Sequence, residues 1–546
     1  MALRRAGMRT RIVRSPHRIR GGARMLLCGI AAVAAAAALA ACGSSASGSN
    51  SAKPQTVTMR INGDFPCLDP YGMDCGGLIT QQIFDAMYDN LVDIGPGGKL
   101  VPYLASSWTT TPTSVTFRIK TGVTCSDGAK LTPVAIAGAI NSFFSRAAAE
   151  GEGEDIAGDW GPGPYKATGD NATQTVRFTL GSPYPTAVYR FAILPIVCPA
   201  GVASNPKATA PLSVFNTKSE GSGPYILVSA THGEQIVLKL RKNWTWGPPG
   251  VTDADLPANL ILREVTDDTT AANMLTTGAL NIGSVEGTDI SRLLSDKSVS
   301  AFAAESYTSY IIVFNETPGH VTDDKNVRKA ITLAINPAAY GKAAFGTAFK
   351  VATDVLSPEA DCYQNDSAII AKPNVTEARA VLKADGYTQG AGGVFEKDGK
   401  PLTVDLDSTT AGINQGGDYV VAALTQLGIK VNATIGDYNT FLQKAIAGQF
   451  DISTDTLPAQ LPTPDFYAEV LIGTDNFDHT VDPQALAASE AAEKQTGCTE
   501  WQKFYADEIS NYDVIPAVYP TTYWFTTNGI KVLPGPNLIE QQYIKS

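Results

Sequence analysis

Residues 114–140 read SVTFRIKTGVTCSDGAKLTPVAIAGAI and pass from a strand through a turn into a helix. The segment Ser114–Lys120 has the alternation and β-branched density that are typical of a strand. Asp127-Gly128 indicates a turn, because glycine accepts a positive φ. Thr132 can cap a helix with Pro133 at its first position, and apolar residues then recur at helical spacing. This stretch therefore predicts a fold that mixes α and β structure.

The same two patterns recur along the chain. Further strands are expected over Thr56–Ile61, Gln174–Leu180, Gln235–Arg241, Tyr310–Asn315, Leu402–Ser408 and Ile429–Ile435. Further helices are expected over Asp324–Ile335, Thr376–Asp385, Asn439–Ala447 and Glu500–Ser510. We interpret their apolar stripes as core, and we find neither an internal repeat nor a long linker. The predicted fold class is mixed α/β with several sheets.

The first 41 residues are typical of an export signal. Eight arginines precede the apolar run Met25–Ala41, which is short for a membrane span. Leu39-Ala40-Ala41-Cys42-Gly43 resembles a bacterial lipobox, which implies cleavage before Cys42 and a lipid on its thiol. A plain secretory signal and an uncleaved anchor are the alternatives. We expect residues 42–55 to be a flexible tether that holds the protein at the cell membrane, lipid-anchored on its extracytoplasmic face.

Composition narrows the class of function. The chain of 546 residues has a formal net charge of −11, and an acidic chain is a poor partner for nucleic acid. The part after the signal is long enough for two or three domains. It contains no GxSxG nucleophile elbow, no GxxxxGK[ST] phosphate loop and no dinucleotide fingerprint. These absences favour a binding protein without a cofactor over an enzyme.

The cysteines predict disulfides. Of eight cysteines, Cys28 lies in the signal and Cys42 carries the expected lipid, which leaves an even number in an exported chain. Several connectivities are possible. Nearest-neighbour pairing is our expectation: Cys67–Cys75, Cys125–Cys198 and Cys362–Cys498. A metal site is disfavoured, because the chain has no CxxC, no HExxH and few histidines.

Short motifs follow one another in a fixed order. They are Leu68-Asp69-Pro70, 83–92 (IFDAMYDNLV), 98–108 (GKLVPYLASSW), 126–132 (SDGAKLT), 221–225 (GSGPY), 327–336 (VRKAITLAIN), 377–387 (EARAVLKADGY), 427–431 (LGIKV) and 448–452 (GQFDI). Each has a structural reading as well; Arg328, for example, is interpreted as the partner of an acid such as Asp324, four residues earlier on its helix. Together, over about residues 56–530, the series resembles the oligopeptide- and dipeptide-binding proteins, family 5 of the solute-binding proteins of ABC importers.

The resemblance implies a two-lobed, periplasmic-binding-protein-like clamshell with an extra domain on the first lobe. Chain crossings near Phe314 and Pro516 would form the hinge. The implied map places the first lobe at 56–85, 216–312 and 516–546, the extra domain at 86–215 and the second lobe at 313–515.

The implied function is capture, without chemistry. A small solute would draw the lobes shut, and the closed monomer would dock on an ABC permease complex in the cytoplasmic membrane. Peptides and non-peptide solutes such as a sugar, an opine or a metal chelate stay open. A non-transport envelope lipoprotein and an exported hydrolase are further alternatives.

The resemblance also implies solute-binding residues. First-lobe contacts are expected at Asn62, Gly63, Asp64 and Phe65, and Tyr307 and Tyr310 are expected either to line the cleft or to pack in the core. Peptide-binding relatives hold the α-ammonium with an aspartate in the loop that here includes Asp455, Thr456, Leu457 and Gln460. Gln460 stands where that aspartate usually lies, and Leu457 where a tryptophan is common. Asp455 or Asp465 would substitute only if the loop shifts.

Overall fold

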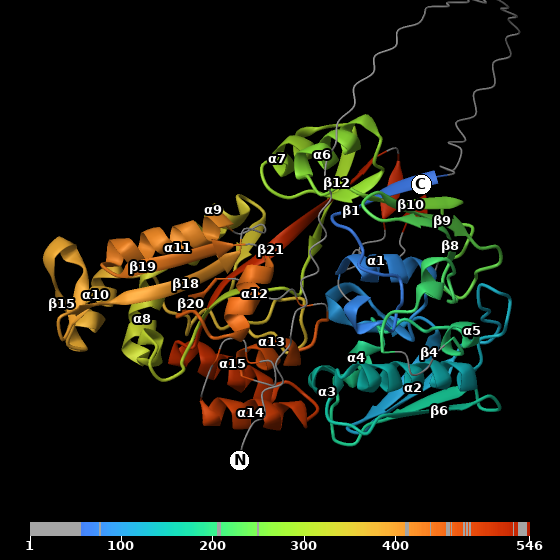
Figure 1. Ribbon diagram of the computed structural model, residues 1–546, viewed down its shortest axis with the longest axis horizontal. Coiled ribbons are helices and arrows are strands. Elements are labelled where there is room, and N and C mark those ends of the chain that lie inside the picture. Colours follow the sequence, from blue (N-terminus) through green and yellow to red (C-terminus); the bar gives the residue numbers. More distant parts are fainter. Residues whose placement is uncertain are drawn as a thin grey trace, which may run out of the picture. The chain divides into compact units, whose positions relative to one another are not determined.

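The structure is a computed structural model, which describes residues 56–75, 78–204, 209–247, 251–409, 414–436, 438–454, 459, 461–472, 476, 479, 482–527, 529–532 and 543–545. Distant parts of the sequence meet in a sheet of twelve strands (Figure 1). Its main path runs through β19 (Lys430–Gly436), β18 (Thr403–Thr409), β20 (Ile452–Ser453), β13 (Tyr310–Phe314), β21 (Val514–Thr527), β11 (Ile282–Ser284), β1 (Thr56–Ile61), β10 (Asn259–Glu264), β9 (Gln235–Leu240) and β8 (Tyr225–Thr231). The strands β12 (Val299–Glu305) and β14 (Phe349–Val351) also pair with β21.

Strand β21 belongs to two groups of strands. Its first part pairs antiparallel with β13, from Val514 opposite Val313 to Val518 opposite Tyr310. Its last part pairs with β12, beginning at Thr521 opposite Glu305. We call β1, β8–β12 and the last part of β21 the first half-sheet. The second half-sheet is β13, β14, β18–β20 and the first part of β21.

Helices cover both faces of the second half-sheet. Successive side chains of a strand point to opposite faces, and in β13 Ile312 and Phe314 lie in one apolar cluster while Ile311 and Val313 lie in another. The first cluster contains residues of α8 (Lys325–Ala334), α9 (Pro337–Phe345), α10 (Val375–Ala384) and α11 (Asn414–Leu427). The other contains residues of α13 (Asp465–Leu471), α14 (Pro483–Glu493) and α15 (Thr499–Asn511).

A separate antiparallel sheet is formed by residues that the sequence assigns to the extra domain. Its order is β4 (Ala105–Thr111), β5 (Ser114–Ile119), β7 (Thr175–Thr179) and β6 (Lys166–Asp170). Helix α2 (Pro133–Glu150) packs on it, and α3 (Gly153–Trp160), α4 (Ala187–Arg190) and α5 (Pro199–Val202) follow. Thr132 caps α2 by accepting a hydrogen bond from Ala135 N, as its position predicts.

The remaining elements are short. They are α1 (Leu78–Met87), α6 (Asp268–Thr277), α7 (Asp289–Ser295), α12 (Tyr438–Ile446), β2 (Val92–Ile94), β3 (Leu100–Pro102), β15 (Thr388–Gln389), β16 (Phe395–Lys397), β17 (Lys400–Pro401), β22 (Ile530–Val532) and β23 (Tyr543–Lys545). Among the described residues, no helix combines the length and the apolar character that a membrane crossing requires.

The expected elements are confirmed. Each predicted strand and helix is present within one residue of its expected ends, and Gly128 has a φ of 86° in the predicted turn. The mixed α/β class follows. The six cysteines form the expected pairs Cys67–Cys75, Cys125–Cys198 and Cys362–Cys498. The last of these links the segment before α10 to the start of α15, so α15 is tied to the second half-sheet.

Candidate functional site

The loop after β1 contains the expected first-lobe contacts. Asn62 and Asp64 are exposed, whereas Phe65 is buried and stacks on His232 with 4.2 Å between the ring centroids. Asp64 Oδ2 lies 3.2 Å from His232 Nδ1. Burial, which raises the pKa of Asp64, is outweighed by hydrogen bonds from Gly233 and His232, and the pKa is lowered. Among these four residues, Asn62 and Asp64 therefore offer polar side chains at the surface, and Phe65 supports the loop.

Tyr307 lies within the segment Ser306–Ser309, which joins β12 to β13, and Tyr310 is the first residue of β13. Tyr307 is buried within the apolar cluster that contains α13 and α15. Tyr310 is half-buried, and its ring centroid lies 4.8 Å from that of Phe345 in α9. Both rings pack, and Tyr310 keeps the greater exposed surface.

The expected second-lobe contacts follow β20. Asp455, Thr456, Leu457 and Gln460 lie outside the described residues. The strand ends next to them are polar and buried, at Ser408, Thr409, Ser453 and Thr454. Since β18 is parallel to both β19 and β20, these ends share one edge of the sheet, which is where open α/β sheets bind ligands.

The sequence analysis did not predict this buried polar edge of the sheet. Thr454 donates to Ser408 Oγ at 2.9 Å, and Tyr340 of α9 donates to the Thr454 carbonyl at 3.1 Å. A run of polar residues that closes an apolar strand was the available signal. These bonds hold the strand ends in place beside the loop that continues from Thr454.

The side chain of Asp465 is bound by residues of the segment 184–190. Its side chain is fully buried, and its Oδ2 accepts hydrogen bonds from Tyr184 at 2.7 Å, Thr186 at 2.9 Å and Arg190 at 3.4 Å. Burial and the neighbouring Asp465 raise the pKa of Tyr184 well above its ordinary value, so this hydroxyl keeps its proton. Asp465 is therefore a poor substitute for the ammonium-binding aspartate of peptide-binding relatives.

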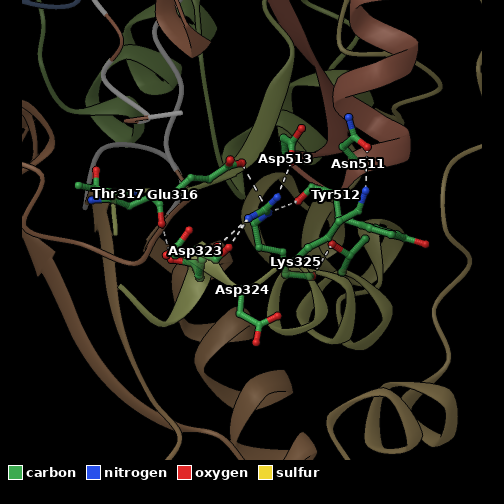
Figure 2. A network of polar contacts seen from close by, with 12 residues as sticks. Glu316, Thr317, Asp323, Asp324, Lys325, Asn511, Tyr512 and Asp513 are labelled. Carbon is green, nitrogen blue, oxygen red and sulfur yellow. Dashed lines mark hydrogen bonds and ion pairs between the residues drawn. The ribbon is translucent and has the colours of Figure 1, made fainter. Parts of the chain in front are cut away.

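A second arginine, Arg328 of α8, donates hydrogen bonds to Tyr512 and Asp513, two residues of the network of polar contacts in Figure 2. It contacts Asp513 Oδ1 at 2.7 Å and lies 3.5 Å from Glu316 Oε1, and all three side chains are buried. The expected pair with Asp324 is wrong. Asp324 instead caps α8 by accepting a hydrogen bond from Asn326 N, because its position before the first turn faces that free donor.

The Arg328 network joins elements within one half-sheet. Glu316 follows β13, and Asp513 precedes β21, which is the neighbouring strand. Burial, and next the charge of Asp513, raise the pKa of Glu316 to about 8, while Arg328 opposes them. Burial also raises the pKa of Asp513. The contacts of Arg328 with Glu316 and Asp513 therefore hold α8 on the sheet, and the arrangement is a structural joint.

Two curated proteins are similar in sequence to this chain. Protein XP55 of Streptomyces lividans is 27% identical over 361 residues, which cover 64% of this chain and 61% of that protein. The glutathione-binding protein GsiB of Escherichia coli (strain K12) is 26% identical over 346 residues, covering 61% and 62%. The chain thus spans about three fifths of the length of these curated relatives.

The fold is also that of a solved binding protein. The oligopeptide-binding protein AppA from Bacillus subtilis, in complex with a nonapeptide, superposes with a TM-score of 0.69 at 18% identity, over 90% of this chain and 100% of the other. This likeness confirms the two-lobed fold of a periplasmic binding protein that the sequence predicts. The pattern of the bacterial extracellular solute-binding proteins, family 5 Middle, matches residues 99–478, so the chain belongs to this family.

Proposed function

We propose that this protein is the solute-binding component of an ABC importer, which captures a peptide or peptide-like solute between its lobes and delivers it to a membrane permease. One observation carries the proposal. Strand β21 runs without interruption from the second half-sheet into the first, so two groups of strands share one strand. Such a shared strand, with one further crossing beside it, suits lobes that rotate about a narrow hinge.

We propose a hinge slightly away from the expected crossings, on the basis of the strand pairing. Phe314 and Pro516 both lie in strands of the second half-sheet, where Pro516 is opposite Ile311. Strand β21 pairs with β13 as far as Val518 and with β14 as far as Pro520, and its pairing with β12 begins at Thr521. We therefore assign the crossings to Ser306–Ser309 and to the middle of β21. The first lobe is then 56–85, 216–305 and 521–546, the extra domain is 86–215, and the second lobe is 310–520.

The location that we propose rests on the expected N-terminal signal. We assign the mature chain to the extracytoplasmic face of the cell membrane, anchored by a lipid on Cys42. The anchor raises the concentration of the protein near its permease. Replacing Cys42→Ala should release the protein into the soluble fraction of lysed cells. Tight retention in the membrane fraction would contradict the anchor.

The solute class depends on the loop after β20. A buried ammonium without a charged partner costs about 3–5 kcal/mol. Gln460 can accept a hydrogen bond but cannot neutralise an ammonium, and Asp465 is already bound by Arg190. We therefore favour peptides whose amino end is modified or lies away from Gln460. The non-peptide solutes remain the second choice.

Mass spectrometry of the solute that co-purifies with the chain is the direct test. We expect peptide or peptide-like masses, and a sugar or a chelate alone would overturn the peptide assignment. Calorimetry then tests the loop. Gln460→Asp should strengthen the binding of peptides with a free amino end, whereas N-acetylated peptides serve as the control. Equal changes for both would show that Gln460 lies elsewhere.

A further inference from the structure

Segment 184–190 of the extra domain is bound to two carboxylates of the second lobe. Tyr184, Thr186 and Arg190 contact Asp465, as described above. Tyr189 donates a hydrogen bond to Asp361 Oδ2. Figure 1 shows α3 and α4 beside α13 and α14, in agreement with these bonds. We call these six residues the polar latch. They lie far in sequence from the crossings at 306–309 and in β21.

Arg190 forms one ion pair with the second lobe, through Asp465, and one within the extra domain. Its other ion pair is with Asp159 of α3, at 3.0 Å, and the Asp159 side chain is 58% exposed. If the second lobe moved away, Arg190 would keep Asp159, and Asp465 would regain water. Breaking a buried ion pair is expensive mainly when one charge stays buried without a partner. The contact with Asp159 avoids this, so the polar latch can open at a moderate cost.

Near the polar latch, the backbone of the extra domain also lies close to the second lobe. Gly98, in the turn between β2 and β3, has a φ of 69°, and a Cβ placed there would lie 2.4 Å from the Glu359 carbonyl oxygen and 2.8 Å from Pro462 Cβ. A side chain at position 98 would therefore push the turn away from the second lobe. Gly98 therefore lies at the same interface between the extra domain and the second lobe as the polar latch.

We propose that the polar latch is a second closing device, which holds the extra domain on the second lobe and favours the closed form before any solute binds. The proposal rests on the proposed function, since it assumes lobes that open. Stabilising the closed form raises the apparent affinity for every solute, because a larger fraction of the protein is competent to close on it. The latch thus sets affinity without contacting the solute.

The test measures closure in the full chain without solute. Donor and acceptor dyes are attached at Lys166→Cys in β6 and Lys383→Cys in α10, two exposed positions on the extra domain and the second lobe. Co-purified solute is removed by unfolding and refolding in detergent with the disulfides intact. Single-molecule energy transfer then gives the ratio of closed to open molecules.

Tyr189→Phe should lower this ratio about fivefold, the effect of one hydrogen bond, and Asp465→Asn should lower it at least as much. Tyr165→Phe is the matched control, because this hydroxyl donates to Gly161 O within the extra domain. Circular dichroism verifies folding. An unchanged ratio in both latch variants would overturn the proposal, as would an equal change in Tyr165→Phe.

The outcomes separate the two proposals. If the latch variants open the solute-free chain but the unmodified chain captures no solute, the latch stands and the importer assignment fails. If the unmodified chain captures its solute with the affinity of the latch variants, the importer assignment stands and the latch fails.

Discussion

Two arginines of this protein lie between two carboxylates, with different surroundings. Arg328 contacts Asp513 and Glu316, which are both buried, and it also donates to the carbonyls of Thr322 and Tyr512. Arg190 contacts Asp465, which is buried, and Asp159, which is largely exposed. All these partners of Arg328 lie close to the ends of β13 and β21 in the second half-sheet. The two acids that contact Arg190 lie in different helices, α3 and α13.

An arginine between two carboxylates can thus form either a permanent joint or a reversible one. An arginine whose acids are all buried cannot lose one without leaving a charge unpaired in the interior. An arginine with one exposed acid on its own side stays paired when the other acid departs. The Arg328 network should therefore determine stability, and the polar latch should determine the balance between open and closed forms.

The largest effect is expected at Arg328. Arg328→Met leaves Glu316 and Asp513 buried without a cation, so the free energy of unfolding should fall by about 3–5 kcal/mol. Guanidinium chloride unfolding followed by circular dichroism measures it. Lys325→Met, which removes an exposed hydrogen bond to Asn511, is the control and should change less than about 1 kcal/mol. A loss at Arg328 as small as the control would contradict a structural joint.

Asp465→Asn should act through the lobe interface. It weakens hydrogen bonds to a charged group and should lower the unfolding free energy by about 1–3 kcal/mol. In a chain that carries Gly98→Ala, where the interface is already disturbed, the loss should shrink. Arg328→Met should cost the same in both backgrounds, because distant sites are additive. Equal losses for Asp465→Asn in both backgrounds would mean that the contact does not depend on closure.

The pH dependence of the unfolding free energy also distinguishes the Arg328 network from the polar latch. Glu316 has a folded pKa of about 8 against an ordinary value of 4.5, so the folded state binds its proton more tightly. Its contribution to stability is complete below about pH 4.5 and is lost as the pH rises to about 8, with a slope of at most about 1.4 kcal/mol per pH unit.

Glu316→Gln should flatten the pH dependence of the unfolding free energy in this window. Glu493, whose pKa is raised to about 8 by burial and by the charges of Glu469 and Asp465, provides the comparison beside the latch. Glu493→Gln should flatten the same window and also change the ratio of closed to open molecules. An unaltered pH profile in Glu316→Gln would refute the raised pKa of Glu316.

The smallest effect is expected at Thr186, which is half-buried. Thr186→Val removes one hydrogen bond to Asp465 and should shift the closed-to-open balance by about 0.5–1 kcal/mol. Energy transfer between the dyes on the two lobes measures the shift. Thr173→Val, in an exposed turn of the extra domain, should leave the balance unchanged. A shift of the same size at Thr173 would assign the effect to the substitution itself.

Local patterns made most of the fold predictable. The cap at Thr132, the turn at Gly128 and the apolar stripe of α8 each depend on neighbours within a few residues, and each is confirmed. The expected loop at 62–65 follows its strand as predicted. The partner of Arg328 was predicted wrongly, because Asp513 is distant in sequence and only the pairing of β13 with β21 brings it near.

The sequence by itself determined the secondary structure and the family, because these follow from local periodicity and from an ordered series of motifs. The cysteines allowed several disulfide connectivities, of which the structure has the nearest-neighbour one. Tertiary structure alone decided that β21 joins two half-sheets and that Asp465 is bound by Arg190. A charge selects its partner by distance and burial in space, and residues nearly three hundred positions apart leave no local pattern of their pairing.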